Sequence, residues 1–373
     1  MNVPFFDLRR LFLCQQRELE EAILDVARSG QYILGEYGRR FEAGLVRSLG
    51  TDGFAAGCNS GTDAIVLGLK ALGIGTGDEV ITVSHTAIPT VSALCEAGAK
   101  PVFVDINPDT WLMDSPLVLS AVTPRTRAIV VVHLYGAMAP VWRIRDALRS
   151  LGREDISLLE DVAQAHGATW EGRAAGTIGD LGCFSFYPTK NIGALGDAGA
   201  VFTRAAEMAE CLKELRHYGQ SDRYRATLAG GINSRLDEFQ AAILLTRLSY
   251  LPAWNARKGN IVMRYREELK DVPLIFQGVV EGVTPAWHLC VVRAESHSIR
   301  DRLMAFLDER GVQTLIHYPF PVHTQSPYAR FARGQTFLNT CLLVDQVVSL
   351  PCNPCVTEDE LSYVISCIRE FFG

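Results

Sequence analysis

The chain has 373 residues, of which 48% are apolar and 21% are charged, and its formal net charge is −6. This composition predicts a folded chain with a sizeable core and excludes an intrinsically disordered protein. The length fits a large domain plus a smaller one better than a single compact domain. Because the chain has no run of lysines or arginines, nucleic acid is not expected as a partner, and an anionic ligand must be held by local groups.

Ten cysteines are spread along the chain without regular spacing. Only Cys352 and Cys355 form a C-x-x-C pair, and without a second such pair we expect no metal site. The cysteines in apolar surroundings are interpreted as buried free thiols, which suits a reducing cytoplasm. Charges at positions 7, 9 and 10 interrupt the N-terminal apolar run, so we expect no signal peptide, and no run is long enough to span a membrane.

The first half of the chain alternates between predicted helices and buried strands. Helical spacing predicts helices over residues 15–28 and 41–49, with a short loop between them at 31–35. Apolar runs that predict strands follow, alternating with further helical segments, at 54–58, 77–83, 101–105, 128–133 and 156–160. Strands with such continuous apolar runs are covered on both faces, so the pattern predicts an α/β fold with a mostly parallel sheet.

The stretch from Phe184 to Gly199 holds one lysine, Lys190, between an aromatic run and a glycine-rich segment. The aromatic residues favour extended backbone, and Pro188 ends the strand because it has no N–H to donate. A lysine at such a strand end is partly desolvated, and desolvation leaves the nucleophilic amine that a Schiff base with an aldehyde cofactor needs. The alternative interpretation is a solvated loop lysine after a buried strand.

Two other strand ends carry residues that suit the same ligand. At Asn59-Ser60-Gly61-Thr62, a small-residue strand leads into a helix whose first N–H groups and positive dipole end suit a phosphate. Asp161 ends the buried strand 156–160, where ligands of open α/β sheets bind, and a protonated pyridine nitrogen would pair with its carboxylate. Ordinary helix N-caps by Asn59 or Ser60, and by Asp161, are the alternatives.

The rest of the chain is predicted to contain a polar loop at 218–231 and a long helix opened by a capping box of Ser234 and Asp237. Apolar patterns restart near residue 251, with predicted strands at 287–292 and 347–350 and helices at 298–310 and 357–371. We therefore expect an N-terminal arm over 1–14, a large domain over 15–250 and a smaller C-terminal α+β domain over 251–373.

Together these motifs resemble the DegT/StrS family of sugar aminotransferases, which use pyridoxal 5′-phosphate. The resemblance runs over nearly the whole chain and rests on six motifs that occur in the family's order, which are Asn59-Ser-Gly-Thr62, Gly77-Asp-Glu-Val80, Glu160-Asp161-Val-Ala-Gln164-Ala-His166-Gly167, Ser185-Phe-Tyr-Pro-Thr-Lys190, Gly196-Asp197 and Asn233-Ser-Arg235. It implies fold type I of these enzymes, with a mostly parallel seven-stranded sheet covered by helices on both faces and a smaller C-terminal domain.

The resemblance also implies roles for individual residues. Lys190 is expected to bond to the cofactor and to shuttle a proton, and Asp161 to keep the pyridine nitrogen protonated. We expect the remaining cofactor contacts from Gln164 at the phenolic oxygen, from Gly61, Thr62 and Ser185 at the phosphate, and from Asn233 of a partner subunit, so that a homodimer completes the site. His166 is expected to support Asp161 from behind. Candidate substrate-binding residues are Tyr32, Tyr187, Arg235, His317, Tyr318 and His323.

The sequence departs from the family at the residue that covers the cofactor ring. The family commonly has an aromatic side chain where this chain has Ala87. If the segment is extended, His85 points to the same side, because side chains alternate with period two, and its flat imidazole is expected to stack on the ring. A second-shell or surface histidine is the alternative.

The expected reaction is transfer of an amino group, with glutamate as the expected donor, to a keto sugar linked to a nucleoside diphosphate. The product would be an amino sugar for a surface glycan or a secondary metabolite. A cyclitol-ketone aminotransferase, a lyase of the same fold and a non-enzymatic sensor are the alternatives. Lys190 argues against the dehydratase branch of the family, in which a histidine replaces this lysine.

Overall fold

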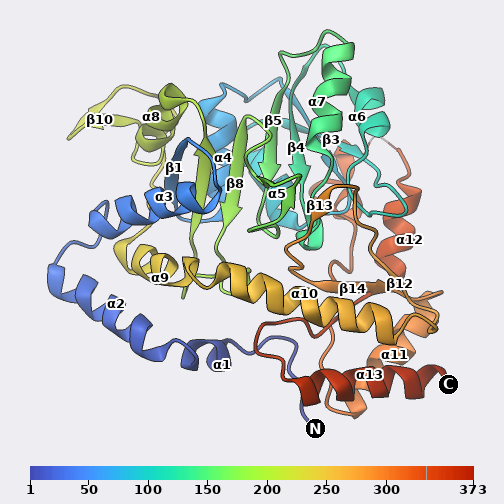
Figure 1. Ribbon diagram of the computed structural model, residues 1–373. Helices are drawn as coiled ribbons and strands as arrows, with labels where there is room; N and C mark the ends of the chain where they lie inside the picture. Colours follow the sequence, from blue (N-terminus) through green and yellow to red (C-terminus); the bar gives the residue numbers. More distant parts are fainter. Residues whose placement is uncertain (333) are drawn as a thin grey trace.

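The computed structural model describes residues 1–332 and 334–373. Its centre is a seven-stranded sheet with the strand order β1-β9-β8-β5-β4-β2-β3 (Figure 1). The strands are β1 (Phe54–Cys58), β2 (Glu79–Val83), β3 (Lys100–Val104), β4 (Thr126–Val132), β5 (Ser157–Asp161), β8 (Leu181–Ser185) and β9 (Gly199–Thr203). Only β9 is antiparallel to its neighbours, β1 and β8. The prediction of a mostly parallel seven-stranded sheet is confirmed.

Alternate residues of the central strands point into two different cores. In β5, Leu158 belongs to one hydrophobic cluster and Leu159 to another, and Ile129 and Val130 of β4 divide in the same way. Successive strand side chains point to opposite faces, so a sheet that is covered on both faces needs apolar residues at every position. This is why the strands appear in the sequence as continuous apolar runs.

Helices cover both faces of the sheet. The first cluster includes residues of α3 (Glu36–Ser48), α7 (Val141–Ser150) and α9 (Glu238–Leu248), and the second includes residues of α4 (Gly61–Ala71), α5 (Ile88–Glu96) and α8 (Ala206–Leu215). The other helices of the first 250 residues are α1 (Leu8–Leu13), α2 (Gln16–Ser29) and α6 (Ser115–Ala121). Two short strands, β6 (Thr169–Trp170) and β7 (Arg173–Ala174), form a separate small sheet with β13 (Val283–Thr284).

The C-terminal part packs around a core of its own. Its elements are α10 (Leu251–Glu268), β12 (Ile275–Phe276), β14 (Cys290–Arg293), α11 (His297–Glu309), α12 (Leu338–Gln346), β15 (Val347–Leu350) and α13 (Glu358–Phe372). Helix α10 crosses the lower part of the molecule in Figure 1. The N-terminal segment joins this core through Val3, which is fully buried and pairs with Val312. No helix in the described part of the chain combines the length and apolar character needed to cross a bilayer.

Three local predictions are wrong. The strand before Lys190 ends at Ser185 rather than continuing through the aromatic residues. Residues 218–231, predicted as a loop, contain a hairpin of β10 (Gln220–Asp222) and β11 (Arg225–Ala226), which projects at the edge of the molecule (Figure 1). Helix α9 is capped by Asp237, whose carboxylate accepts from Gln240 N, so no capping box forms at Ser234.

Ser234 instead joins the strand end of Asn59. Its hydroxyl donates to Asp63 Oδ2 at 2.6 Å and accepts from Asn59 N at 3.1 Å. A serine hydroxyl can donate and accept at the same time, so Ser234 connects two segments that lie 171 residues apart in sequence. This long-range contact outweighs the local capping preference that the sequence suggested.

Candidate active site

Lys190 lies in a turn just beyond the end of β8. Its backbone N–H donates to Tyr187 O at 2.8 Å, and its side chain is half-buried. Burial lowers the pKa of Lys190 from 10.5 to about 8, while the negative charge of Asp161 acts in the opposite direction. An amine with this pKa is about half unprotonated near pH 8, which a nucleophile requires.

Asp161 ends the neighbouring strand β5 and is 7% exposed. Its Oδ2 accepts a hydrogen bond from Thr90 Oγ1 at 2.9 Å, and its Oδ1 accepts from Ala163 N at 3.1 Å. Thr86 Oγ1 lies 2.9 Å from Thr90 Oγ1, and because the Thr90 proton points to Asp161, Thr86 is the donor of that pair. The carboxylate is therefore held in one orientation by Thr90 of α5 and by the backbone just after β5.

The other carboxylate of this strand end, Glu160, is fully buried and serves the fold. It accepts from the backbone N–H groups of Gly176 and Ile178 and from His133 Nε2 at 2.7–2.8 Å. Burial raises the pKa of Glu160, but these hydrogen bonds and the His133 contact outweigh burial, so the net shift is downward. Glu160 therefore stays ionised, and its carboxylate oxygens are bonded within the fold.

Tyr135, which the sequence did not indicate as a site residue, hydrogen-bonds to three predicted site residues, and one of these three bonds to a fourth. Its backbone N–H donates to Gln164 Oε1 at 2.6 Å, and its hydroxyl donates to the His317 carbonyl oxygen. Because that hydroxyl proton is used, His85 Nε2, 2.6 Å away, must carry the proton that it donates to Tyr135 Oη. Gln164 Nε2 in turn donates to Tyr318 Oη at 2.8 Å.

The titratable groups around Tyr135 are uncharged at neutral pH. Burial lowers the pKa of His85 to about 4. Burial also raises the pKa of Tyr318 far above its ordinary value, and the charge of Asp161 adds to this shift.

The segment at 84–86 is bent rather than extended, so the period-two alternation that predicted the direction of the His85 side chain does not apply. Whether His85 covers a ring therefore stays a prediction.

The candidate phosphate site lies between the start of α4 and the end of β8. A Cβ atom on Gly61 would lie 2.5 Å from Ser185 Cβ, so only glycine allows this approach. Ser60 caps the helix by accepting from Asp63 N at 3.0 Å, which confirms the N-cap interpretation without excluding an anion at the neighbouring N–H groups. Thr62 lies in the same first turn of α4.

Several predicted residues lie apart from this group. His323 is buried against Phe337, with Nδ1 2.9 Å from Ser84 Oγ. Tyr32 stacks on Phe239 and is 49% exposed. Asn233, Arg235 and Tyr187 form no hydrogen bond with Asp161 or Gln164 within the described chain. Asn233 is exposed, and its carbonyl oxygen accepts a hydrogen bond from Asn59 Nδ2 at 2.9 Å.

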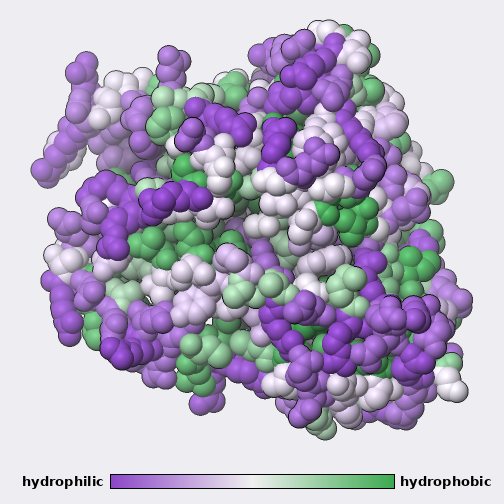
Figure 2. Space-filling view, in the orientation of Figure 1, coloured by the Kyte–Doolittle hydropathy of each residue, from purple (hydrophilic) through white to green (hydrophobic). Residues whose placement is uncertain are grey.

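His166 does not support Asp161 through a hydrogen bond in the described structure. Its ring is 2% exposed, lies against Phe184 and Phe186, and has no hydrogen-bond partner of ordinary geometry at either nitrogen. It lines a cavity of about 600 Å³ between α3 and α10, and Figure 2 shows a hollow with apolar side chains in this part of the surface. The predicted role of His166 is therefore not supported.

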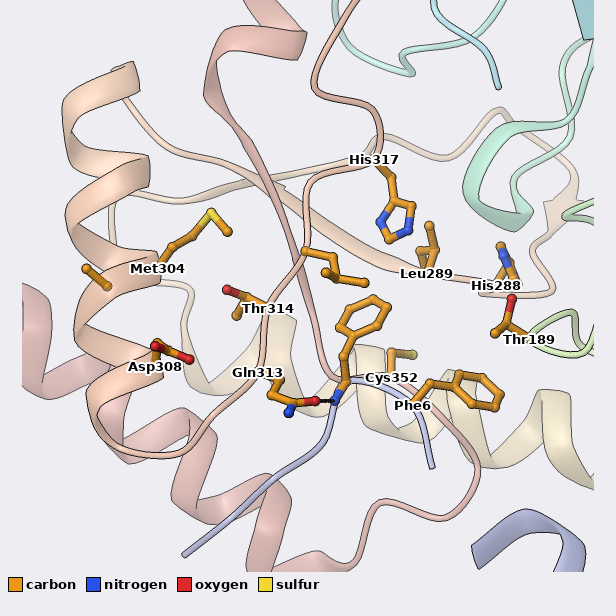
Figure 3. A pocket seen from close by; sticks show the side chains of 13 residues that line it. Phe6, Thr189, His288, Leu289, Met304, Asp308, Gln313, Thr314, His317 and Cys352 are labelled. Carbon is orange, nitrogen blue, oxygen red and sulfur yellow. Dashed lines mark hydrogen bonds between the residues drawn. The ribbon is translucent and has the colours of Figure 1, made fainter. Parts of the chain in front are cut away.

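A second cavity, of about 620 Å³, borders the turn of Lys190 (Figure 3). Thr189, His288 and His317 line one end, and Met304 and Asp308 of α11 line the other. The His317 ring stacks on Phe5 at 5.6 Å, which brings the N-terminal segment to the cavity. No lysine or arginine of the described chain lines it, so this cavity offers no lysine or arginine charge to a diphosphate.

Comparisons with known proteins agree with this fold. The profile of the DegT/DnrJ/EryC1/StrS aminotransferase family matches residues 13–369. A dTDP-3-amino-3,4,6-trideoxy-alpha-D-glucose transaminase from Streptomyces venezuelae is 44% identical over 99% of this chain and 96% of its own length. The crystal structure of S. venezuelae DesV in complex with a ketimine intermediate has a TM-score of 0.94, at 42% identity over 99% of this chain and 98% of that chain. NtdA from Bacillus subtilis, solved with bound cofactor PMP, has a TM-score of 0.92, at 30% identity over 100% and 85%.

The sheet, the strand-end amine and the matching structures define an aminotransferase of fold type I. Within that class, the chain belongs to the DegT/DnrJ/EryC1/StrS aminotransferase family. Its cofactor is pyridoxal 5′-phosphate. The described residues fit this group, because the close approach at Gly61 leaves a helix N-terminus for the phosphate, and a carboxylate and an amine of lowered pKa stand at neighbouring strand ends.

Proposed function

We propose that this enzyme transfers an amino group from an amino acid, glutamate by family resemblance, to a keto sugar linked to a nucleoside diphosphate, with C3 of the sugar as the acceptor carbon. The carrying observation is the 44% identity, over almost all of both chains, with a relative named for a dTDP-3-amino sugar. The product would serve a surface glycan or a secondary metabolite. Ten free cysteines favour the cytoplasm as its location.

In this proposal the cofactor is held at three points. The N–H groups at Gly61 and Thr62 and the hydroxyl of Ser185 bind the phosphate. Asp161 binds the ring nitrogen, and its fixed orientation by Thr90 and Ala163 supports this role. Gln164 would bind the phenolic oxygen, and its hydrogen bonds with Tyr135 and Tyr318 fix the orientation of its amide.

Lys190 carries the chemistry. When bound, pyridoxal phosphate supplies an aldehyde that accepts the amino group and a ring that withdraws electrons from the reacting carbon. Lys190 Nζ would hold that aldehyde in the resting enzyme, and once released its free amine would take the proton from the substrate carbon and later give it back. The neutral His85 and Tyr135 leave Asp161 as the one negative charge among these groups, which favours a proton on the ring nitrogen.

The β10–β11 hairpin suits the nucleotide of a partner subunit's substrate. Tyr224 at its tip is 84% exposed, and the exposed Arg223 and Arg225 flank it. An aromatic ring offers stacking for a base, and guanidinium groups bind phosphates. Replacing both arginines with alanine is expected to raise the KM for the nucleotide sugar with little change in KM for the amino acid; equal changes in both KM values would contradict this role.

A homodimer would complete the site through Asn233 and Arg235. The exposed Asn233 and the exposed apolar side chains of Tyr32, Ile33 and Leu195 favour a covered surface there. The test mixes Lys190→Ala and Asn233→Ala, two variants that are each expected to be inactive, under conditions that exchange subunits. If sites are shared, mixed dimers contain one complete site and activity returns. If each chain completes its own site, the mixture stays as inactive as its components.

The alternatives make different predictions in a half-reaction panel. The pyridoxamine form of the enzyme is mixed with dTDP-3-keto, dTDP-4-keto and UDP-3-keto sugars and with a cyclitol ketone, and return of the pyridoxal absorbance is followed. The proposal expects the fastest return with a nucleotide 3-keto sugar, and a faster return with the cyclitol would overturn it. A lyase that mobilises sulfur would need a reactive cysteine, and Cys352 and Cys355 are the candidates. It is disfavoured, because burial raises the pKa of each to about 11 and keeps both as thiols.

A further inference from the structure

Asn191, the residue after Lys190, is the centre of a buried hydrogen-bond network. It is 4% exposed, and its Nδ2 donates to Ala286 O and to Asn255 Oδ1, both at 2.7 Å. Its Oδ1 accepts from Lys258 Nζ at 3.1 Å and lies 3.0 Å from His288 Nδ1. Because an amide oxygen only accepts, His288 carries its proton on Nδ1. The amide of Asn191 thus has a partner for each of its groups.

Lys258 is a buried lysine near the half-buried Lys190. It is 1% exposed, and its Nζ donates to Asn191 Oδ1 and to the His288 carbonyl oxygen, the latter at 2.9 Å. Among the described residues it forms no ion pair. A lysine buried without a carboxylate is costly, and burial lowers the pKa of Lys258 to about 8. Such a costly group is more readily explained by a role than by packing alone.

The network joins two parts of the molecule. Lys258 lies on α10, which buries Leu251 in the core around the large sheet and Ile261 and Tyr265 in the C-terminal core. Residues 286–288 lead into β14 of the C-terminal sheet. Asn191 belongs to the Lys190 segment. The ammonium of Lys258 therefore connects the segment that carries the reactive amine to both parts.

We propose that Lys258 is a positioning residue, which holds the Lys190 segment in register with the C-terminal part through Asn191 and the His288 carbonyl. Loss of its ammonium leaves that carbonyl without its donor and releases one of the two contacts on Asn191 Oδ1. Lys190 would then sample more orientations relative to the cofactor site. The inference rests on the proposed role of Lys190.

The test measures hydrogen exchange of the peptide over 186–195 in the purified holoenzyme. The amides of Lys190 and Ala194 report directly, because they donate to Tyr187 O and Phe186 O. In Lys258→Met we expect exchange of this peptide to rise about tenfold or more, as expected for a lost buried hydrogen bond to a charged donor, with weaker cofactor retention. Lys258→Arg, which keeps a donor, should lie nearer to the wild type.

The matched control is Arg300→Met. Arg300 is also a buried cation, 4% exposed, but it lies on α11 and donates to Val347 O. It is not part of the hydrogen-bond network around Asn191. Equal exchange of the 186–195 peptide in the Lys258 and Arg300 variants would overturn the positioning role. Borohydride reduction of the wild type separates this failure from failure of the proposed function, because a phosphopyridoxyl group on a lysine other than Lys190 would contradict the latter.

Discussion

Replacing Gly61 with alanine is expected to loosen the cofactor without unfolding the protein. The new Cβ would lie 2.5 Å from Ser185 Cβ and 3.1 Å from Ser185 Cα, whereas carbon atoms in contact need about 3.5 Å. The start of α4 must therefore move by about 1 Å from β8. A shift of that size breaks the alignment of one N–H with the phosphate, which costs about 1.5–3 kcal/mol, or roughly ten- to hundredfold in affinity.

The assay is a titration of the apoenzyme with pyridoxal phosphate, followed by the absorbance of the bound cofactor. Gly75→Ala is the matched control, because a Cβ on Gly75 would meet only Ala97 O at an ordinary 3.5 Å. We expect the control to bind as the wild type does. Wild-type affinity in Gly61→Ala, with an unchanged melting temperature, would show that the phosphate lies elsewhere.

Three further outcomes follow from the site. Asp161→Asn should retain the cofactor but lose activity by about 100-fold or more, since a neutral amide does not hold a proton on the ring nitrogen; near-normal turnover would show that the carboxylate is misplaced. The rate of cofactor attachment to the apoenzyme should rise with pH and show an inflection near pH 8, the pKa of Lys190. In Asp161→Asn this inflection should move to lower pH, because the Asp161 charge raises the pKa of Lys190. An inflection near pH 10.5 would contradict the burial of Lys190. His85→Ala should weaken cofactor binding about two- to tenfold, which corresponds to the stacking free energy of one ring, and His85→Phe should retain most of the affinity. Equal affinity in the wild type and the alanine variant would show that another residue covers the ring.

The sequence was sufficient to predict the sheet and the residues at its strand ends. Parallel strands covered on both faces leave continuous apolar runs, and the strand ends carry Asp161 and the residues before Lys190 in recognisable motifs. Residues at neighbouring strand ends lie near one another by topology alone, so the effect of the Asp161 charge on Lys190 needed no knowledge of long-range packing. The downward pKa shift of Lys190 also followed from its expected burial.

Contacts between distant segments were beyond sequence reasoning. Tyr135 follows β4 in a left-handed backbone conformation with φ of 64°, and nothing in its neighbourhood marks it as the partner of both His85 and Gln164. The sequence predicted Ser234 as a helix cap, but its hydroxyl donates a hydrogen bond to Asp63, 171 residues away. Thr90, which donates a hydrogen bond to Asp161, could have been predicted as a site residue, because it follows His85 closely in the sequence.

The measurement that tests the central claim most directly is identification of the lysine that carries the cofactor. The holoenzyme is reduced with borohydride, digested and analysed by peptide mass spectrometry. We expect the phosphopyridoxyl group on Lys190, the amine beside Asp161 whose pKa burial lowers to about 8. Its appearance on Lys258, a buried lysine with a similarly lowered pKa, or on any further lysine would contradict the account.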